Sequence, residues 1–397
     1  MEATVKGTVK VLKGNSAASH AVLLCKPDVV AAYPITPQSP VVEELSKFHA
    51  NGLLESEFVE VEGEHSAMSV IIGASSAGGR VFSATSSNGL AFMFEAYLYA
   101  STLRLPIVMV EVCRELAAPN TVLCSQQDIL TMRDAGWIQI HAESCQEILD
   151  TIIMAYKLAE DSDIQLPVNV CYDGHYLSHL SARVEIPDQA DVDSFLPARG
   201  VPEDRLDPDK PMMQGVFLGG KLFAEFRYKH CLAMSHAKQK IDDIDKAFHK
   251  SFGRSYGGLI EEYRTEDAEF LLLTMGSAAS TAKVVVDNKR DHGVRVGLVR
   301  IRTFRPFPLE RLAKVVQNKK ALGVIDRDVC FGWSTGIIFM EMRAALNKLG
   351  MSIPMVNFID GLSGADITPE HIEKAVDITR RAATGEPYQE VTWLILE

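Results

Sequence analysis

Short runs of apolar and β-branched residues alternate with longer stretches of helical periodicity over the first 175 residues. The apolar runs are nearly continuous, which is typical of parallel strands buried on both faces. The sequence therefore predicts an α/β domain with a mostly parallel sheet covered by helices on both sides. The predicted strands are Val29–Tyr33, Glu57–Val61, Arg80–Ala84, Pro106–Val112, Trp137–His141 and Pro167–Cys171, and the predicted helices are Ser16–Cys25, Val41–His49, Glu64–Ser76, Gly89–Thr102, Asp128–Asp134 and Gln146–Glu160.

The alternation breaks between residues 180 and 258 and resumes after them. Clustered prolines and acidic residues predict a long surface excursion that joins two domains and could wrap a partner subunit. A charged helix is expected within it at Ser235–Lys250. Strand–helix alternation from Phe270 onward predicts a second, smaller α/β domain. The expected division is therefore 1–180, 181–262 and 263–397.

Composition and charge exclude several classes of protein. Of the 397 residues, 47% are hydrophobic and 23% charged, which is globular rather than disordered composition. The formal charge of -12 disfavours nucleic acid as a partner. No apolar run is long enough for a membrane span, and the N-terminal residues lack the apolar segment of a secretory signal, so a cytoplasmic location is expected. The seven scattered cysteines, none in a Cys-x-x-Cys pair, predict reduced thiols without a metal cluster.

Two polar side chains follow predicted strands, at the edge where open parallel sheets bind ligands. Thr36 lies in a loop with Pro34, Pro37 and Pro40, which would hold its hydroxyl in one place. The alternative is a plain strand-to-helix turn with Pro40 at the first helical position. Glu64 begins an apolar helix that is expected to be buried, where a carboxyl group without a partner has a raised pKa suited to acid–base chemistry. Its alternative role is to stabilise the helix N-terminus.

Arg114 follows the predicted strand Pro106–Val112 and should face the same crevice. A guanidinium group there suits a substrate carboxylate through two parallel hydrogen bonds. An ion pair with Glu115 or Asp128 is the structural alternative. Structural or solvated roles, without zinc-like companions, are expected for His65, His141, His175 and His179.

Several motifs resemble those of the α subunits of thiamine diphosphate-dependent 2-oxoacid:acceptor oxidoreductases, the pyruvate:ferredoxin oxidoreductase superfamily. The resemblance covers nearly the whole chain. It implies a thiamine-binding domain of the pyrimidine type, followed by a smaller α/β domain like the transketolase C-terminal domain. The motifs that carry it are Tyr33–Pro37, Glu62–Ala67, Arg114–Pro119, Arg133–Trp137 and Gly361–Thr368.

The resemblance also implies roles for individual residues. Glu64 corresponds to the glutamate that contacts N1′ of the aminopyrimidine ring and favours its imino tautomer. Pro34, Ile35 and Thr36 correspond to the loop that contacts the cofactor. Thr36 also lies near the substrate, and Arg114 corresponds to the arginine that receives the 2-oxoacid carboxylate.

A missing motif implies partner subunits. Thiamine enzymes usually hold the diphosphate through Mg²⁺ bound by a Gly-Asp-Gly motif, which this chain does not contain. The resemblance therefore implies a β subunit with the diphosphate and Mg²⁺ half of the site, and γ and ferredoxin-like δ subunits with [4Fe-4S] clusters. The implied reaction is oxidative decarboxylation of a 2-oxoacid with coenzyme A. Electrons would pass to ferredoxin, or to NAD through a flavin subunit.

Departures from the pyruvate-type pattern bear on the substrate. Cys113 replaces an asparagine before the arginine, and Leu123, Cys124 and Gln127 stand where tryptophans occur. A smaller, more apolar lining would admit a bulkier side chain. Phenylglyoxylate, giving benzoyl-CoA as in the family's aryl member, is therefore slightly preferred over pyruvate or another 2-oxoacid. A transketolase-like partner or lipoamide-linked dehydrogenase, and a non-catalytic scaffold subunit, are the alternative functions.

Overall fold

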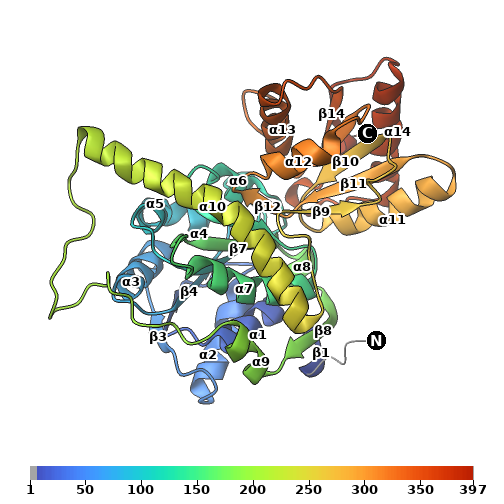
Figure 1. Cartoon of the computed structure of the whole chain (residues 1–397). Helices are drawn as coiled ribbons and strands as arrows, with labels where there is room; N and C mark the ends of the chain where they lie inside the picture. The colour runs from blue at the N-terminus through green and yellow to red at the C-terminus, as the bar shows by residue number, and fades with distance from the viewer. Residues whose placement is uncertain (1–6, 397) are drawn as a thin grey trace.

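The computed structural model describes residues 7–396. The first domain contains a central seven-stranded sheet (Figure 1). Six of the strands are parallel neighbours, and one edge strand is antiparallel. The central strands are buried on both faces, as their continuous apolar runs predicted. In spatial order the strands are β12 (Thr303–Arg305), β6 (Ile138–His141), β7 (Val168–Asp173), β5 (Val108–Cys113), β4 (Val81–Thr85), β2 (Val29–Ala32) and β3 (Glu57–Glu60).

Helices cover this sheet, and their bounds lie close to the predicted ones. The helix predicted at Glu64–Ser76 has those bounds, whereas the one predicted at Gly89–Thr102 is two helices that meet at Met93. Trp137 anchors one side of the core, because its ring stacks on Tyr97 at 4.1 Å and its indole N–H donates to the Tyr97 carbonyl at 2.8 Å. The helices are α1 (Gly14–Cys25), α2 (Ser39–Ala50), α3 (Glu64–Ser76), α4 (Asn88–Phe92), α5 (Phe94–Thr102), α6 (Gln127–Thr131), α7 (Cys145–Ala159) and α8 (Tyr176–His179).

The second domain is the smaller α/β unit that the sequence predicted. Its six-stranded sheet is parallel except for the edge strand β9. The strands in spatial order are β15 (Val391–Trp393), β14 (Met355–Ile359), β13 (Leu322–Asp326), β10 (Phe270–Thr274), β11 (Val296–Ile301) and β9 (Ile260–Tyr263). The main helices are α11 (Ala278–Asp291), α12 (Leu309–Val316), α13 (Ile337–Lys348) and α14 (Pro369–Thr384).

The two domains share structure rather than meeting only at a linker. Strand β12 follows β11 in the chain but pairs with β6 of the first sheet, with Thr303 opposite Ile140. Thr303 and Phe304 are fully buried there. A single hydrophobic core consequently contains residues from both domains.

Residues 180–258 differ from the predicted surface excursion. Ser181–Pro187 forms strand β8, which pairs antiparallel with β1 (Gly7–Lys13), and Gln189–Phe195 forms helix α9. Helix α10 runs over Gly220–Phe252 and so begins 15 residues before the predicted Ser235 (235 − 220). The prediction failed there because the early part of α10 buries no side chain, so no inward-facing apolar stripe marks it.

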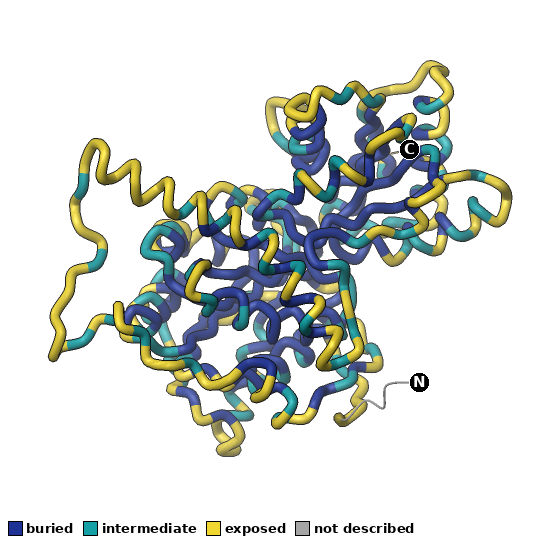
Figure 2. The backbone as a smooth tube through the Cα atoms, in the orientation of Figure 1, coloured by how far each residue is buried: buried dark blue, intermediate teal, exposed yellow. Residues whose placement is uncertain are grey.

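An arm (residues 208–232) projects from the first domain (Figures 1 and 2). It comprises the loop before α10 and the first turns of that helix, and the first buried residue of α10 is Ala233. None of the described helices has both the length and the apolar character of a membrane span. The large apolar side chains exposed on the arm are Met212, Met213, Val216, Phe217, Leu222, Phe223, Phe226, Tyr228 and Leu232.

Candidate functional site

The loops after four neighbouring strands meet at one edge of the large sheet. Thr36 follows β2, Glu64 follows β3, Ser87 follows β4 and Arg114 follows β5. These strands are parallel neighbours, so their carboxyl ends lie on the same side. The structure thus brings the predicted residues to the same edge of the sheet, where the crevice was expected. Thr36 and Arg114 are in direct contact, because Nη1 of Arg114 donates to the Thr36 carbonyl at 2.7 Å.

The loop that carries Thr36 is held from beneath by buried polar groups. Nδ2 of Asn15 donates to the Pro37 carbonyl at 2.8 Å, and the Tyr172 hydroxyl donates to Oδ1 of Asn15 at 2.8 Å. Thr36 itself is exposed, as is Pro34, while Ile35 is half-buried. The loop also makes the expected turn into α2, with Pro40 in its first turn. The role of the Thr36 hydroxyl in binding a ligand stays a prediction.

Glu64 is a buried carboxyl group at the first position of α3, with 7% of its surface exposed. Burial raises its pKa, and only a hydrogen bond from its own backbone opposes that shift. Gly89 fits closely against it, since a Cβ atom there would lie 2.5 Å from both Oε1 of Glu64 and Oγ1 of Thr85. The helix start therefore carries a proton-binding group that forms no ion pair with a described residue, which helix stabilisation alone would not require.

Arg114 does not form either of the ion pairs considered as alternatives. Asp128 accepts a hydrogen bond from the backbone N–H of Arg114 at 2.8 Å, not from its side chain. The Glu115 carboxylate accepts from the Leu116 N–H at 3.1 Å. Nε of Arg114 is buried without a hydrogen-bond partner among the described residues. The guanidinium group thus retains donors that an incoming carboxylate could use.

A buried pair of carboxyl groups supports this crevice and was not predicted from the sequence. Glu111 and Asp128, both fully buried, accept from the Ser87 N–H at 2.9 and 3.1 Å. Burial raises the pKa of Asp128 to about 7 and, together with Asp128, raises that of Glu111 well above its usual range. A shared proton between them would hold the Ser87 turn and the Arg114 backbone in place. A charged residue within the otherwise apolar strand β5 was the available signal.

A cleft of about 640 Å³ opens between the two domains beside this crevice. Gly174 lines the cleft and also packs closely against Cys113 and the Thr36 loop. A Cβ atom at this position would lie 2.4 Å from the Cys113 carbonyl and 2.9 Å from the Pro37 ring. The motif at Gly361–Thr368 reaches this cleft from the second domain through residues 364–368. The other lining residues include Leu123, Cys124, His175, His179, Ser277 and Arg327.

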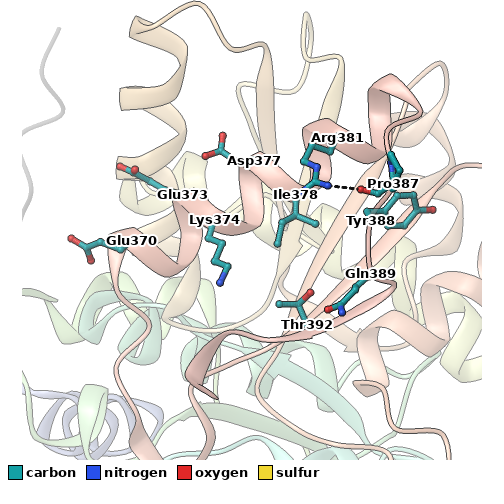
Figure 3. Close-up of a pocket in the computed structure, with 10 residues that line it drawn as sticks. All are labelled: Glu370, Glu373, Lys374, Asp377, Ile378, Arg381, Pro387, Tyr388, Gln389 and Thr392. Carbon is teal, nitrogen blue, oxygen red and sulfur yellow. Dashed lines mark hydrogen bonds between the residues drawn. The ribbon is translucent and has the colours of Figure 1, made fainter. Parts of the chain in front are cut away.

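A second hollow of about 770 Å³ lies on the surface of the second domain, between α14 and the segment that leads into β15 (Figure 3). Acidic side chains Glu370, Glu373 and Asp377 line its helical wall, and Arg381 donates to the Pro387 carbonyl at 2.7 Å. None of the predicted site residues lines it.

The expectation that His141 lacks zinc-like companions is wrong. His141 lies with Cys113 and Cys171, and one potential ligand atom from each lies within 4.8 Å of the other two. Gaps of 28 and 30 residues separate the three along the chain (141 − 113 and 171 − 141), so close sequence spacing gave no signal. His175 is exposed as expected, and His65 and His179 are half-buried.

Comparison with known proteins agrees with this architecture. Residues 20–246 match the family described as pyruvate flavodoxin/ferredoxin oxidoreductase, thiamine diP-bdg. Residues 268–372 match pyruvate:ferredoxin oxidoreductase core domain II. The 2-oxoglutarate:ferredoxin oxidoreductase of Magnetococcus marinus has a similar fold, with a TM-score of 0.73 at 21% identity over 93% of this chain and 65% of that chain.

Two curated relatives cover almost the whole chain. The chain is 45% identical to the NADH-dependent phenylglyoxylate dehydrogenase subunit alpha of Aromatoleum evansii, over 96% of this chain and 93% of the relative. It is 46% identical to the pyruvate synthase subunit PorA of Methanothermobacter thermautotrophicus, over 98% of both. These matches confirm the resemblance inferred from the motifs: the chain belongs to the pyruvate:ferredoxin oxidoreductase superfamily, as a member of its α-subunit family.

Proposed function

We propose that this chain is the α subunit of a thiamine diphosphate-dependent 2-oxoacid oxidoreductase and supplies the aminopyrimidine half of the active site. The observation that carries the proposal is Glu64, a buried carboxyl group with a raised pKa on the same sheet edge as Arg114. The residues present fit this half of the cofactor. A carboxyl group without a cation suits a ring nitrogen, and Gly89 leaves it room.

Each residue of the crevice would have a separate role. When bound, thiamine diphosphate would supply the carbanion chemistry of 2-oxoacid decarboxylation. Glu64 would hold a proton against N1′ of the aminopyrimidine ring, and its raised pKa favours that protonated contact. Arg114 would receive the substrate carboxylate through its unused donors, and Thr36 with Pro34 and Ile35 would form the wall between substrate and cofactor.

The other half of the site would come from partner subunits. The chain has no Gly-Asp-Gly motif, which supports a β subunit that carries Mg²⁺ and the diphosphate. An exposed aromatic residue near Glu64 supports a covering chain there, since Phe92 packs on the neighbouring Gly63 and has 62% of its surface exposed. We infer γ and ferredoxin-like δ subunits with [4Fe-4S] clusters, and coenzyme A as co-substrate. Ferredoxin, or NAD through a flavin subunit, would be the acceptor.

Phenylglyoxylate remains slightly preferred as the substrate, with pyruvate or another 2-oxoacid as the alternative. The relatives named for phenylglyoxylate and pyruvate are equally similar to this chain, so identity does not discriminate between them. Leu123 supports the larger substrate because it is half-buried and lines the cleft beside the Thr36 loop. Cys124 also lines the cleft but has only 1% of its surface exposed, so it gives little support. Cys113 gives no such support, since its side chain is fully buried.

The test is Glu64→Gln in the assembled complex, assayed with 2-oxoacid, coenzyme A and a viologen dye. Loss of the carboxyl group should lower kcat by about 10²–10⁴-fold while the subunit composition stays unchanged. Glu62→Gln is the matched control, because this neighbouring carboxylate is exposed and only accepts from the Ser66 hydroxyl. Near-normal turnover in Glu64→Gln would contradict the proposed role of this chain.

Assays of the unmodified complex test the substrate and the class of enzyme. A higher kcat/KM for phenylglyoxylate than for pyruvate would support the aryl substrate, and the reverse would favour pyruvate. Iron and acid-labile sulfide in the purified complex would distinguish the oxidoreductase from a lipoamide-linked or transketolase-like enzyme, whose subunits need no such clusters.

A further inference from the structure

A group of soft ligands lies beneath the crevice and has no part in the proposed reaction. Cys113, His141 and Cys171 are buried, with at most 1% of any of them exposed. One potential ligand atom from each lies within 4.8 Å of the other two. Nε2 of His141 has no hydrogen-bond partner among the described residues. A buried, unpaired ring nitrogen is costly to leave without a partner, and two thiols lie within 4.8 Å of a nitrogen of the same ring.

The strand register explains why the three side chains converge. His141 on β6 is the direct partner of Cys171 on β7. Cys171 is in turn the direct partner of Glu111 on β5, and Cys113 lies two residues beyond Glu111. Alternate residues of a strand point to the same face, so all three side chains project from one face of three adjacent strands. The backbone of the sheet thus fixes the group in place.

We propose that Cys113, His141 and Cys171 form a binding site for a thiophilic d¹⁰ metal cation, with Zn²⁺ as the expected occupant. Two cysteine thiolates and a neutral imidazole are common zinc ligands. Two thiolates also balance the charge of Zn²⁺, so that the bound group is neutral, whereas Cu⁺ would leave a buried negative charge.

The spacing is compatible with a shared ion. Zinc bonds of about 2.3 Å to sulfur and about 2.0 Å to nitrogen place ligand atoms of a tetrahedral site about 3.5–3.8 Å apart. A separation within 4.8 Å therefore needs side-chain movements of about 1 Å and no change in the strands. No fourth His, Cys, Asp or Glu of the described chain shares this spacing, so a water molecule would complete the coordination.

The position of the site indicates a structural role. The ion would cross-link β5, β6 and β7, and Cys113 directly precedes Arg114. Strand β6 has only four residues and also pairs with β12, the strand contributed from the second domain. A metal ion here would fix the end of β5, where Arg114 begins its loop, to the strand that joins the domains.

Metal analysis of the purified full-length chain tests the site. We expect about one zinc ion per chain, retained after gel filtration, and at least a tenfold lower content in Cys171→Ser and in His141→Asn. Cys25→Ser is the matched control, because Cys25 is an equally buried thiol outside the group. It should keep the zinc content of the unmodified chain.

Measurements on the unmodified chain cover the case in which the variants do not fold. Cobalt substitution should give a near-ultraviolet thiolate-to-metal absorption band, and X-ray absorption should show two sulfur ligands. Copper in place of zinc would keep the site and revise its occupant. Less than about 0.1 metal ion per chain, both as purified and after incubation with Zn²⁺ or Cu⁺, would overturn the proposal. A disulfide between Cys113 and Cys171 in the purified chain would do the same.

Discussion

Glu64 shows how a buried carboxyl group lowers the stability of a folded chain. A carboxylate placed at a helix start is normally solvated, yet here the helix is apolar and the group is buried without a cation. Burial penalises its charged form, which is why its pKa is raised. A group held in this way destabilises the folded state at neutral pH, and such strain is common where function requires it.

Replacing that carboxyl group should therefore stabilise the isolated chain. Because the folded-state pKa of Glu64 is raised, its destabilising effect is absent below the unfolded pKa of about 4.3 and grows as the pH rises through the folded value. Glu64→Gln should raise the thermal unfolding midpoint at pH 7–8 and leave it nearly unchanged at pH 4. Differential scanning fluorimetry across this pH range measures the difference.

The neighbouring Glu62 is a control, because its pKa is shifted in the opposite direction. Its hydrogen bond from Ser66 lowers its pKa, so that its charged form stabilises the folded chain slightly. Glu62→Gln should lower the midpoint slightly at pH 7, if it changes it at all. A lower midpoint for Glu64→Gln at neutral pH would mean that the carboxylate is a stabilising helix partner rather than a buried acid.

At the level of elements, buried structure was predictable and exposed structure was not. The bounds of α3 and the central strands followed from continuous apolar runs. Strand β1 escaped prediction because it is an exposed edge strand, and its residues show no alternation of buried and exposed positions. Strand β12 has three residues, and its partner β6 lies in the other domain, so no local pattern marks it.

In the candidate site, too, some residues were predictable from the sequence and others were not. Thr36, Glu64 and Arg114 each carry a local signal, because each follows a strand or starts a helix in the sequence. The Glu111 and Asp128 pair and the group around His141 depend on which strands are neighbours in the sheet. No single segment of the sequence determines the order of the strands, so these contacts could be found only in the three-dimensional structure.

The arm exposes many large apolar side chains, which suggests a contact with another subunit. Phe223 and Phe226, with 47% and 54% of their surfaces exposed, lie on the part of α10 that buries nothing within the chain. Apolar surface of this kind marks a contact between chains. Phe223→Ser combined with Phe226→Ser should weaken assembly into the proposed complex by at least tenfold, measured by native mass spectrometry at decreasing concentration.

The isolated chain should be insensitive to the same change, since the side chains of Phe223 and Phe226 are exposed within it. Val284→Ser is a suitable control, because Val284 is exposed on α11, away from the arm. It should leave assembly unchanged. Equal assembly of the arm variant and the unmodified chain would show that the arm is not a subunit contact.

At the scale of the whole molecule, a buried charge cluster joins the two domains. Glu147 of α7 accepts from Arg300 at 2.8 Å and from Arg302 at 2.7 Å, and all three side chains are at most 2% exposed. Strand β11 and the residues after it supply both arginines. The cluster also contains equal numbers of opposite charges, so that it is neutral as a whole: Glu143, Glu147 and Glu261 against Lys283, Arg300 and Arg302.

Removing the central carboxylate should loosen the contact between the domains. Glu147→Gln would leave Arg302 without a carboxylate partner among the described residues, and an uncompensated buried charge costs about 3–5 kcal/mol. The urea unfolding midpoint of the purified chain should therefore fall. Glu310→Gln is the control, because the Glu310 side chain is 66% exposed in its pair with Lys238, and such a surface pair contributes about 0–1 kcal/mol. A shift for Glu147→Gln no larger than that control would mean that β12 and the shared apolar core, rather than the charges, hold the domains together.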